Sequence, residues 1–363
     1  MTKRPEPRPH LLAVQPYVAG KRKASAEGKV IKLSSNENPY GPSPKAAEAY
    51  KAAAADLHRY GDSHAVELRE TIAEVQGLPA EQIVCGSGSD ELISLLIHCY
   101  ASNGGEVLFT KHAFAMYRIY SMASGAIPVE VEETNLHADV DKLLTGVTDS
   151  TKIVFLANPN NPTGTYLPAS EVKRLRDGLP EDVLLVIDGA YAEFMTQADY
   201  TDGRELVAAG ENTVMLRTFS KVYGLPALRL GWGYFPPAVA DILNRARSPF
   251  NINAAAMAAG VAAMRDQAYL QEMVAKNNAK RDALTASLTQ LGYEVVPSCG
   301  NFILVKSADA KALNAHLLSK QIIVREMGGY HLPDYLRISI GTTEENAVLL
   351  AEMEQFLKGA DVA

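Results

Sequence analysis

The sequence predicts an α/β protein with two unequal domains: a large one, built on a mostly parallel sheet that helices flank on both faces, and a smaller α+β one. Apolar strand-like runs alternate with helical patterns between residues 82 and 219, which is typical of parallel strands buried on both faces. The chain of 363 residues also exceeds what one ordinary hydrophobic core holds. A second domain is therefore expected.

The predicted elements of the large domain follow one another in a regular order. A helical pattern covers residues 43 to 60, with Ser43 as its N-cap and Pro44 at the first helical position. Strand-like and helical runs then alternate as "QIVCG", "SDELISLLIHCYA", "EVLFT", "AFAMYRIYSMAS", "AIPVEVE", "KIVFLAN", "PASEVKRLRDGL", "DVLLVID" and "TVMLRTF".

The C-terminal third has a different pattern. A separate α+β unit is predicted there, from the runs "GYEVVPSCGNFILVK", "AKALNAHLLSK", "IIVREM" and "YLRISIG" and a final helix. We expect an N-terminal arm over residues 1–42 that adds to this unit, a large domain over 43–253 and a small domain over 254–363.

Composition disfavours several classes of protein. The chain has 35 basic and 42 acidic residues and a net charge of -7, and its longest basic block is "KRK". This charge pattern argues against a nucleic-acid-binding surface. No segment resembles a signal peptide or is long and apolar enough to span a membrane, so a cytoplasmic enzyme is expected. Three scattered cysteines and histidines without ligand spacing predict neither disulfides nor a metal site.

Polar groups gather where the predicted strands end, which is where ligands bind in an open α/β sheet. The turn "GSGSDE" over 86–91 opens a helix and can bind a phosphate through backbone N–H groups. The turn "NPNNPTG" over 158–164 is richer in proline and asparagine than a simple turn requires. Asp188 and Tyr191 follow the next strand, and Lys221 the one after. Each feature alone has an ordinary explanation, such as a helix cap or a solvated lysine, but together they predict a site.

A pyridine cofactor that carries an aldehyde and a phosphate fits these groups. Lys221 would form a Schiff base with the aldehyde, and Asp188 would keep the ring nitrogen protonated, so that the ring acts as an electron sink. The hydroxyls of Thr218 and Ser220 and the guanidinium of Arg229 would bind the phosphate. The residues therefore predict a cofactor that combines a pyridine ring, an aldehyde and a phosphate.

Three motifs resemble the signatures of the class II aminotransferases, pyridoxal-phosphate-dependent transferases of fold type I: "ANPNNPTG", "DGAYAEF" and "RTFSKVYGLPALRLGW". With "LSSNENPYGPSP" near the start and "YLRISIGT" near the end, the chain is most similar to the histidinol-phosphate aminotransferases within that family. The resemblance extends from about Tyr17 to Gly341. Its motifs are more specific for the cofactor than for the substrate.

The resemblance implies a role for individual residues. Lys221 matches the Schiff-base lysine, which also moves a proton between substrate and cofactor. Asp188 matches the partner of the ring nitrogen, and Asn161 and Tyr191 match the donors to the ring's phenolate oxygen; Lys221, Asp188 and Tyr191 form the expected catalytic set. Phe114 stands where the family places an aromatic ring stacked on the cofactor. The expected phosphate site consists of Ser87, Gly88, Ser89, Thr218, Ser220 and Arg229.

Assembly and substrate follow from the same resemblance. Tyr60 in "HRYGD" matches a tyrosine that reaches the cofactor phosphate of the neighbouring subunit, which implies a homodimer with shared active sites, to which the N-terminal arm also adds contacts. The expected substrate-binding residues are Tyr17, Asn36, Arg325 and Arg337. Histidinol phosphate has a phosphomonoester where glutamate and 2-oxoglutarate have a carboxylate, and two guanidiniums serve both anions better than one.

Three positions depart from the family pattern and leave the substrate open. Gly61 stands where proline is common, Pro226 and Ala227 stand where Ala-Gly is more usual, and Phe114 lacks a tyrosine's hydroxyl. Three readings are therefore kept: transamination of histidinol phosphate with 2-oxoglutarate in histidine biosynthesis, transamination of aromatic amino acids or prephenate, and a lyase such as a decarboxylase. A regulator that uses the fold only for binding is disfavoured.

Overall fold

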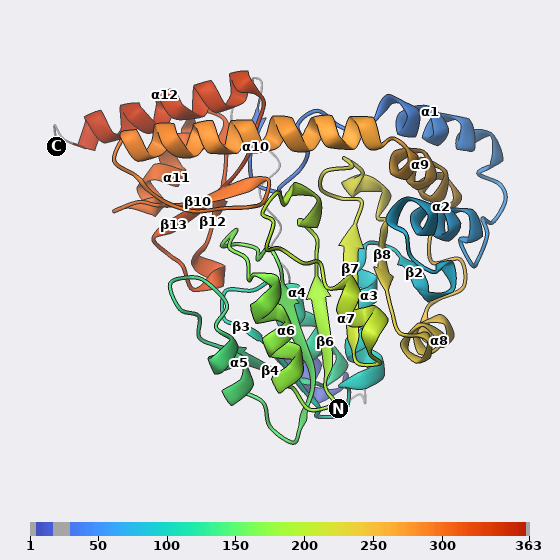
Figure 1. The fold of residues 1–363 in the computed structure, drawn as a ribbon. Helices are drawn as coiled ribbons and strands as arrows, with labels where there is room; N and C mark the ends of the chain where they lie inside the picture. The colour runs from blue at the N-terminus through green and yellow to red at the C-terminus, as the bar shows by residue number, and fades with distance from the viewer. Residues whose placement is uncertain (1–4, 17–29, 361–363) are drawn as a thin grey trace.

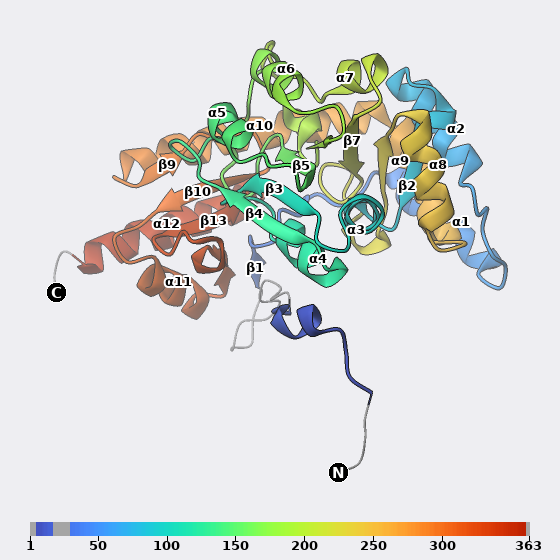
Figure 2. The same cartoon turned by 90° about the horizontal axis from the view of Figure 1, so that it is seen from below.

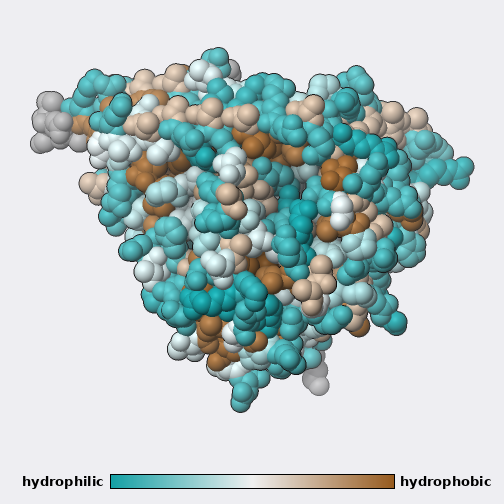
Figure 3. Space-filling model, viewed as in Figure 1, coloured by the Kyte–Doolittle hydropathy of each residue, from teal (hydrophilic) through white to brown (hydrophobic). Residues whose placement is uncertain are grey.

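The computed structural model describes residues 5–16 and 30–360. Figure 1 shows a large layered body around a central sheet and a smaller unit beside it, joined along one edge by a long helix. No helix in the described ranges is both long and apolar enough to cross a membrane. On the face drawn in Figure 3, hydrophobic residues lie in small groups among hydrophilic ones, as is usual for a protein surface.

The central sheet has seven strands in the order β2-β8-β7-β6-β5-β3-β4. All of them run parallel except β8, which is antiparallel to both of its neighbours. The predicted strands are present, and β8 is the one that sequence patterning missed, because "GWGY" is short and half glycine. The strands are β2 (Ile83–Gly86), β3 (Glu106–Thr110), β4 (Ile127–Val131), β5 (Thr151–Ala157), β6 (Leu184–Asp188), β7 (Thr213–Thr218) and β8 (Gly231–Tyr234).

Helices cover both faces of this sheet. They are α1 (Pro44–Ala53), α2 (Val66–Gln76), α3 (Ser89–Tyr100), α4 (Met116–Ser124), α5 (Val140–Thr145), α6 (Ala169–Gly178), α7 (Arg204–Ala209), α8 (Pro237–Ala246) and α9 (Ala254–Arg265). Figure 2 shows α5, α6 and α7 on one side and α3 and α4 on the other. The mostly parallel α/β class is confirmed.

Side chains of one strand show how the two cores form. Ile153 and Phe155 of β5 pack in the core with α3 and α4, whereas Val154 and Leu156 pack in the opposite core with α5 and α6. Successive side chains of a strand point to opposite faces, so a strand between two helix layers must be apolar at every position. The predicted first helix also begins as expected: Ser43 Oγ accepts a hydrogen bond of 3.2 Å from the Ala46 amide.

The smaller unit contains an antiparallel sheet in the order β12-β13-β10-β9. Its elements are α10 (Gln267–Gln290), β9 (Glu294–Val296), β10 (Phe302–Lys306), α11 (Ala310–Ser319), β11 (Ile322–Ile323), β12 (Arg325–Glu326), β13 (Tyr335–Ser339) and α12 (Thr343–Ala360). A segment of the N-terminal arm joins them: β1 (Ile31–Lys32) pairs in parallel with β11, and Leu33 packs in the same core.

The helix after the expected domain boundary packs with the large body. Ala256 and Ala259 of α9 lie in one core with Leu68 and Ile72 of α2. The next helix, α10, then runs along the molecule from α9 to the small sheet (Figure 1). We therefore propose that the boundary lies within α10 rather than directly after Asn253.

Candidate active site

A pocket opens at the carboxyl ends of the central parallel strands. Ala157 of β5, Asp188 of β6 and Leu216 of β7 are register partners, so the segments that follow these strands begin at one level of the sheet. The pocket has an empty volume of about 680 Å³, open solvent included, within the range of small-molecule sites. Its lining contains these predicted residues: Ser89, Phe114, Asn161, Asp188, Tyr191, Thr218, Ser220, Lys221 and Arg229.

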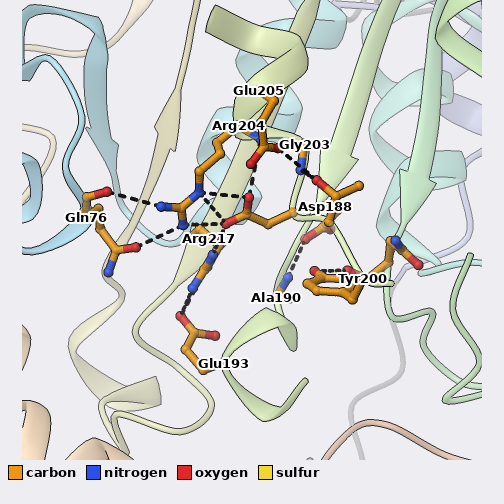
Figure 4. Close-up of polar contacts among 12 residues, drawn as sticks. Gln76, Asp188, Ala190, Glu193, Tyr200, Gly203, Arg204, Glu205 and Arg217 are labelled. Carbon is orange, nitrogen blue, oxygen red and sulfur yellow. Dashed lines mark hydrogen bonds and ion pairs between the residues drawn. The ribbon is translucent and has the colours of Figure 1, made fainter. Parts of the chain in front are cut away.

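Asp188 is a buried carboxylate at the floor of this pocket. Its Oδ2 accepts a hydrogen bond of 2.7 Å from the Tyr117 hydroxyl. Its Oδ1 accepts one of 3.1 Å from the Ala190 amide (Figure 4). Burial raises the pKa of Asp188 to about 6, although both hydrogen bonds act to lower it. A carboxylate held this way gains from a cationic partner, such as a protonated ring nitrogen.

Lys221 and Tyr191 lie on the same side of the pocket. The Lys221 amine is 5.6 Å from the centre of the Tyr191 ring. The Tyr191 hydroxyl accepts a hydrogen bond of 2.9 Å from Asn36 Nδ2, which leaves its own hydrogen available for a ligand oxygen. Asn36 comes from the N-terminal arm, so the arm takes part in the site.

Asn161 joins the pocket to the small sheet. Its Oδ1 accepts a hydrogen bond from Arg337 of β13, and the same guanidinium donates at 2.9 Å to the Ser34 carbonyl. Because Arg337 occupies the amide oxygen, the Nδ2 donor of Asn161 is the group that faces a ligand. Arg337 is buried and also lies over the Phe302 ring, at 5.5 Å.

The turn between β2 and α3 has two features that suit an anion. Gly88 has φ +81°, and a Cβ there would lie 2.6 Å from Arg229 Nη2, so a side chain would push the guanidinium away. No side chain caps the first turn of α3, which leaves its N–H groups for an anion. Arg229 is held at 2.9 Å by Asp90, and Ser220 lines the same pocket.

A buried ion network links β7 to the turn after β6 and to the start of α7. Arg217 of β7 donates to Glu193 Oε1 at 2.9 Å and to Asp202 Oδ2 at 2.8 Å, and Arg204 donates to Asp202 at 2.7 Å. Figure 4 shows Arg217 between Glu193 and Arg204. Burial alone would lower the pKa of Arg217, but the two carboxylates raise it. The network fixes the segments that carry Tyr191 and Lys221.

Some predicted residues lie outside this pocket. The Ser87 hydroxyl donates to the Asn251 carbonyl at 3.0 Å, so it faces the loop before α9. Tyr60 is 83% exposed and stacks on Phe250, with ring centres 4.6 Å apart. Arg325 of β12 is partly exposed and is the register partner of Arg337. Tyr17 lies outside the described residues.

Sequence reasoning missed two polar residues of the pocket, Tyr117 and Asp90. Asp90 was visible in the "GSGSDE" turn as a helix-start residue, but its pairing with Arg229 spans 139 positions. Tyr117 stands three positions after Phe114 in the run predicted to be helical, a spacing that predicts one shared face, although α4 itself begins at Met116. Nothing in the sequence showed that this face meets Asp188.

The donor set fits a pyridine aldehyde phosphate. The buried carboxylate of Asp188 suits a protonated ring nitrogen, the Lys221 amine lines the same pocket, and Tyr191 and Asn161 have donors suited to a ring oxygen. Uncapped helix N–H groups and Arg229 suit a phosphate at the far end.

Known proteins were compared with the chain as a whole. Residues 28–353 match the family model "Aminotransferase class I and II". A histidinol-phosphate aminotransferase of Paramagnetospirillum magneticum is 53% identical over 97% of this chain and 99% of its own length. One of Rhodospirillum centenum is 48% identical over 98% and 99%. The crystal structure of histidinol-phosphate aminotransferase from Sinorhizobium meliloti in complex with pyridoxal-5'-phosphate superposes with a TM-score of 0.90, at 28% identity, and covers 97% of each chain.

Proposed function

The chain belongs to the class I and II aminotransferases, and from this premise we propose its reaction. It transfers the amino group of histidinol phosphate to 2-oxoglutarate, giving imidazole acetol phosphate and glutamate, a reversible step of histidine biosynthesis. Relatives that carry this name are 48% and 53% identical over nearly the whole chain. In the structure, the supporting observation is the cross-strand pair of Arg325 and Arg337 beside the pocket.

The cofactor is pyridoxal 5'-phosphate. When bound, it supplies an aldehyde that takes up the amino group and a ring that accepts the electrons of the broken C–H bond. Asp188 would hold the ring nitrogen, Tyr191 and Asn161 would hold the ring oxygen, and Arg229, Ser220 and the first turn of α3 would hold the phosphate. The stacked ring on the open face would be Phe114, which lines the pocket.

Lys221 is the base of the reaction in this proposal. Its amine lines the pocket and lies over the Tyr191 ring. Removal of the α-proton from the substrate and its return at a neighbouring carbon require one group that reaches both positions. A lysine on a flexible four-carbon side chain does so, while the Arg217 network keeps its backbone in place.

The two arginines account for substrates with different anions. Residues directly opposite on antiparallel strands share a face of the sheet, so Arg325 and Arg337 project to the same side. Arg337 already contacts Asn161 in the pocket. A phosphomonoester carries more charge than a carboxylate and gains more from a second guanidinium. The pair therefore suits an enzyme that alternates between histidinol phosphate and glutamate.

The test compares amino donors in single half-reactions. Histidinol phosphate should react faster than phenylalanine, and Arg325→Ala should lower kcat/KM for histidinol phosphate by about tenfold or more while affecting phenylalanine less. Lys306→Ala, which removes an exposed cation from the same sheet, is the matched control and should affect neither. Slow turnover of histidinol phosphate with fast turnover of phenylalanine, or of prephenate supplied as acceptor together with an amino donor, would instead favour an aromatic or prephenate aminotransferase.

We further propose that the protein acts as a homodimer whose subunits share their sites. Tyr60 is 83% exposed and stacks on the exposed Phe250, and Leu57 and Val66, near it in the sequence, are exposed as well. A tyrosine stacked on a phenylalanine in a group of exposed apolar side chains is suited to a protein partner. In the dimer, the Tyr60 hydroxyl would reach the cofactor phosphate of the neighbouring subunit.

A further inference from the structure

Tyr117 is a fully buried residue of α4 that contacts the floor of the pocket through its hydroxyl. The hydroxyl donates to Asp188 Oδ2 at 2.7 Å. Its ring is fixed from three sides: it stacks on Phe155 with centres 4.4 Å apart, and it meets Phe109 and Phe114 edge-on at 5.9 and 5.8 Å. The direction of the hydroxyl is therefore set by aromatic packing.

The hydrogen bonds to Asp188 come from two separate elements. The Tyr117 hydroxyl on α4 donates to Oδ2, and the Ala190 amide after β6 donates to Oδ1. A carboxylate with a donor on each oxygen has a fixed plane, which aims its remaining lone pairs into the pocket. Donors also favour the ionised form of a buried carboxylate, and burial opposes it.

Other charged groups near Asp188 act in opposite directions. The Lys221 amine favours the ionised carboxylate, and the Asp90 carboxylate disfavours it. Burial, together with the nearby Asp188 carboxylate and the Tyr191 hydroxyl, raises the pKa of Tyr117 well above its usual range. Tyr117 therefore stays protonated as a hydrogen-bond donor throughout the working pH range.

We propose that Tyr117 is a positioning residue that keeps the Asp188 carboxylate ionised and aimed at the ring nitrogen of pyridoxal 5'-phosphate. The inference rests on the proposed function, because it is that cofactor which needs the carboxylate. Tyr117 also supports Phe114 edge-on, so one side chain braces two groups expected to touch the cofactor ring.

The test is Tyr117→Phe, which keeps the ring and its packing and removes only the hydroxyl. The dissociation constant for pyridoxal 5'-phosphate is measured by fluorescence between pH 6 and pH 8, on wild type and variant. Without the hydroxyl the pKa of Asp188 rises further, so the carboxyl is more often neutral at low pH. We expect binding about tenfold or more weaker at pH 6, with a smaller loss at pH 8.

Two comparisons separate positioning from a general loss of structure. Tyr293→Phe removes another buried hydroxyl, one that donates to the Met353 carbonyl in the small unit, and it should leave cofactor binding unchanged at every pH. In an Asp188→Asn background, Tyr117→Phe should lose its pH-dependent effect. Equal dissociation constants for Tyr117→Phe and wild type at pH 6, or a loss that is the same at all pH values, would overturn the proposal.

A third variant covers the case in which Tyr117→Phe does not fold. Tyr117→3-fluorotyrosine keeps the shape and makes the hydroxyl a stronger donor, so it should bind the cofactor more tightly than wild type at pH 6; equal or weaker binding counts against the inference. A wild-type protein that neither binds pyridoxal 5'-phosphate nor transaminates would refute the proposed function. A working wild type with an unaffected Tyr117→Phe would refute only the role of Tyr117.

Discussion

Replacing Arg217 by methionine tests whether the buried ion network holds the site together. The Arg217 and Glu193 side chains are 6% and 4% exposed, and Asp202 is 10% exposed. In Arg217→Met, Asp202 keeps its bond of 2.7 Å from Arg204. Glu193 loses both hydrogen bonds that Arg217 donates to its Oε1, and among the described residues its Oε2 has no hydrogen-bond partner.

The expected loss of folding free energy follows from this difference between Asp202, which keeps a cationic partner, and Glu193, which does not. Removing one member of a buried ion pair costs about 3 to 5 kcal/mol, because the other charge stays buried without compensation. Since only one of the two carboxylates is left without a cation, we expect the lower end, about 3 kcal/mol. That is a large part of the 5 to 15 kcal/mol by which proteins are ordinarily stable.

The assay is urea unfolding of wild type and variants, followed by circular dichroism. Arg118→Met is the control, because Arg118 pairs with Glu130 at the surface, is 45% exposed, and should cost less than about 1 kcal/mol. The double variant Arg217→Met/Glu193→Gln removes the stranded charge and should recover part of the loss. A loss below about 1 kcal/mol in Arg217→Met, or no recovery in the double variant, would refute the reasoning.

Three further predictions concern the site itself. Lys221→Ala should lower turnover by about 10³-fold or more and remove the visible absorbance of protein-bound cofactor; near wild-type transamination would show that another group is the base. Co-expressed Tyr60→Phe and Lys221→Ala chains should form hybrid dimers with one intact site, and activity no higher than that of the parent variants would exclude sharing of Tyr60 between subunits. Burial raises the pKa of Asp188 to about 6, from 3.8, so the cofactor-free protein binds this proton more tightly when folded and loses stability as pH rises through 6. Asp188→Asn should therefore gain about 3 kcal/mol relative to wild type between pH 4 and pH 7, and a difference that does not change with pH would contradict this account.

Local sequence patterns predicted the helices and strands well where a segment is buried along its length and therefore consists mainly of apolar residues. The strands β5, β6 and β7 are buried along nearly their whole length, so each contains an uninterrupted apolar run, namely "IVFLA", "LLVI" and "VML". The exception was β8, whose glycines lie close to neighbouring groups: a Cβ at Gly231 would be 2.2 Å from the Ser89 amide. Small residues required by close packing look like a turn when only the sequence is read.

The sequence by itself determined the chemical groups of the site and the edge of the sheet on which they stand. Asp188 ends one apolar run and Lys221 stands three positions after the strand β7, and parallel strands bring such positions to one edge. Only the tertiary structure decided which groups meet, because hydrogen bonds such as Tyr117 to Asp188 and Arg337 to Asn161 span 71 and 176 positions. Contacts of that kind depend on how helices and strands pack, and no local spacing encodes them.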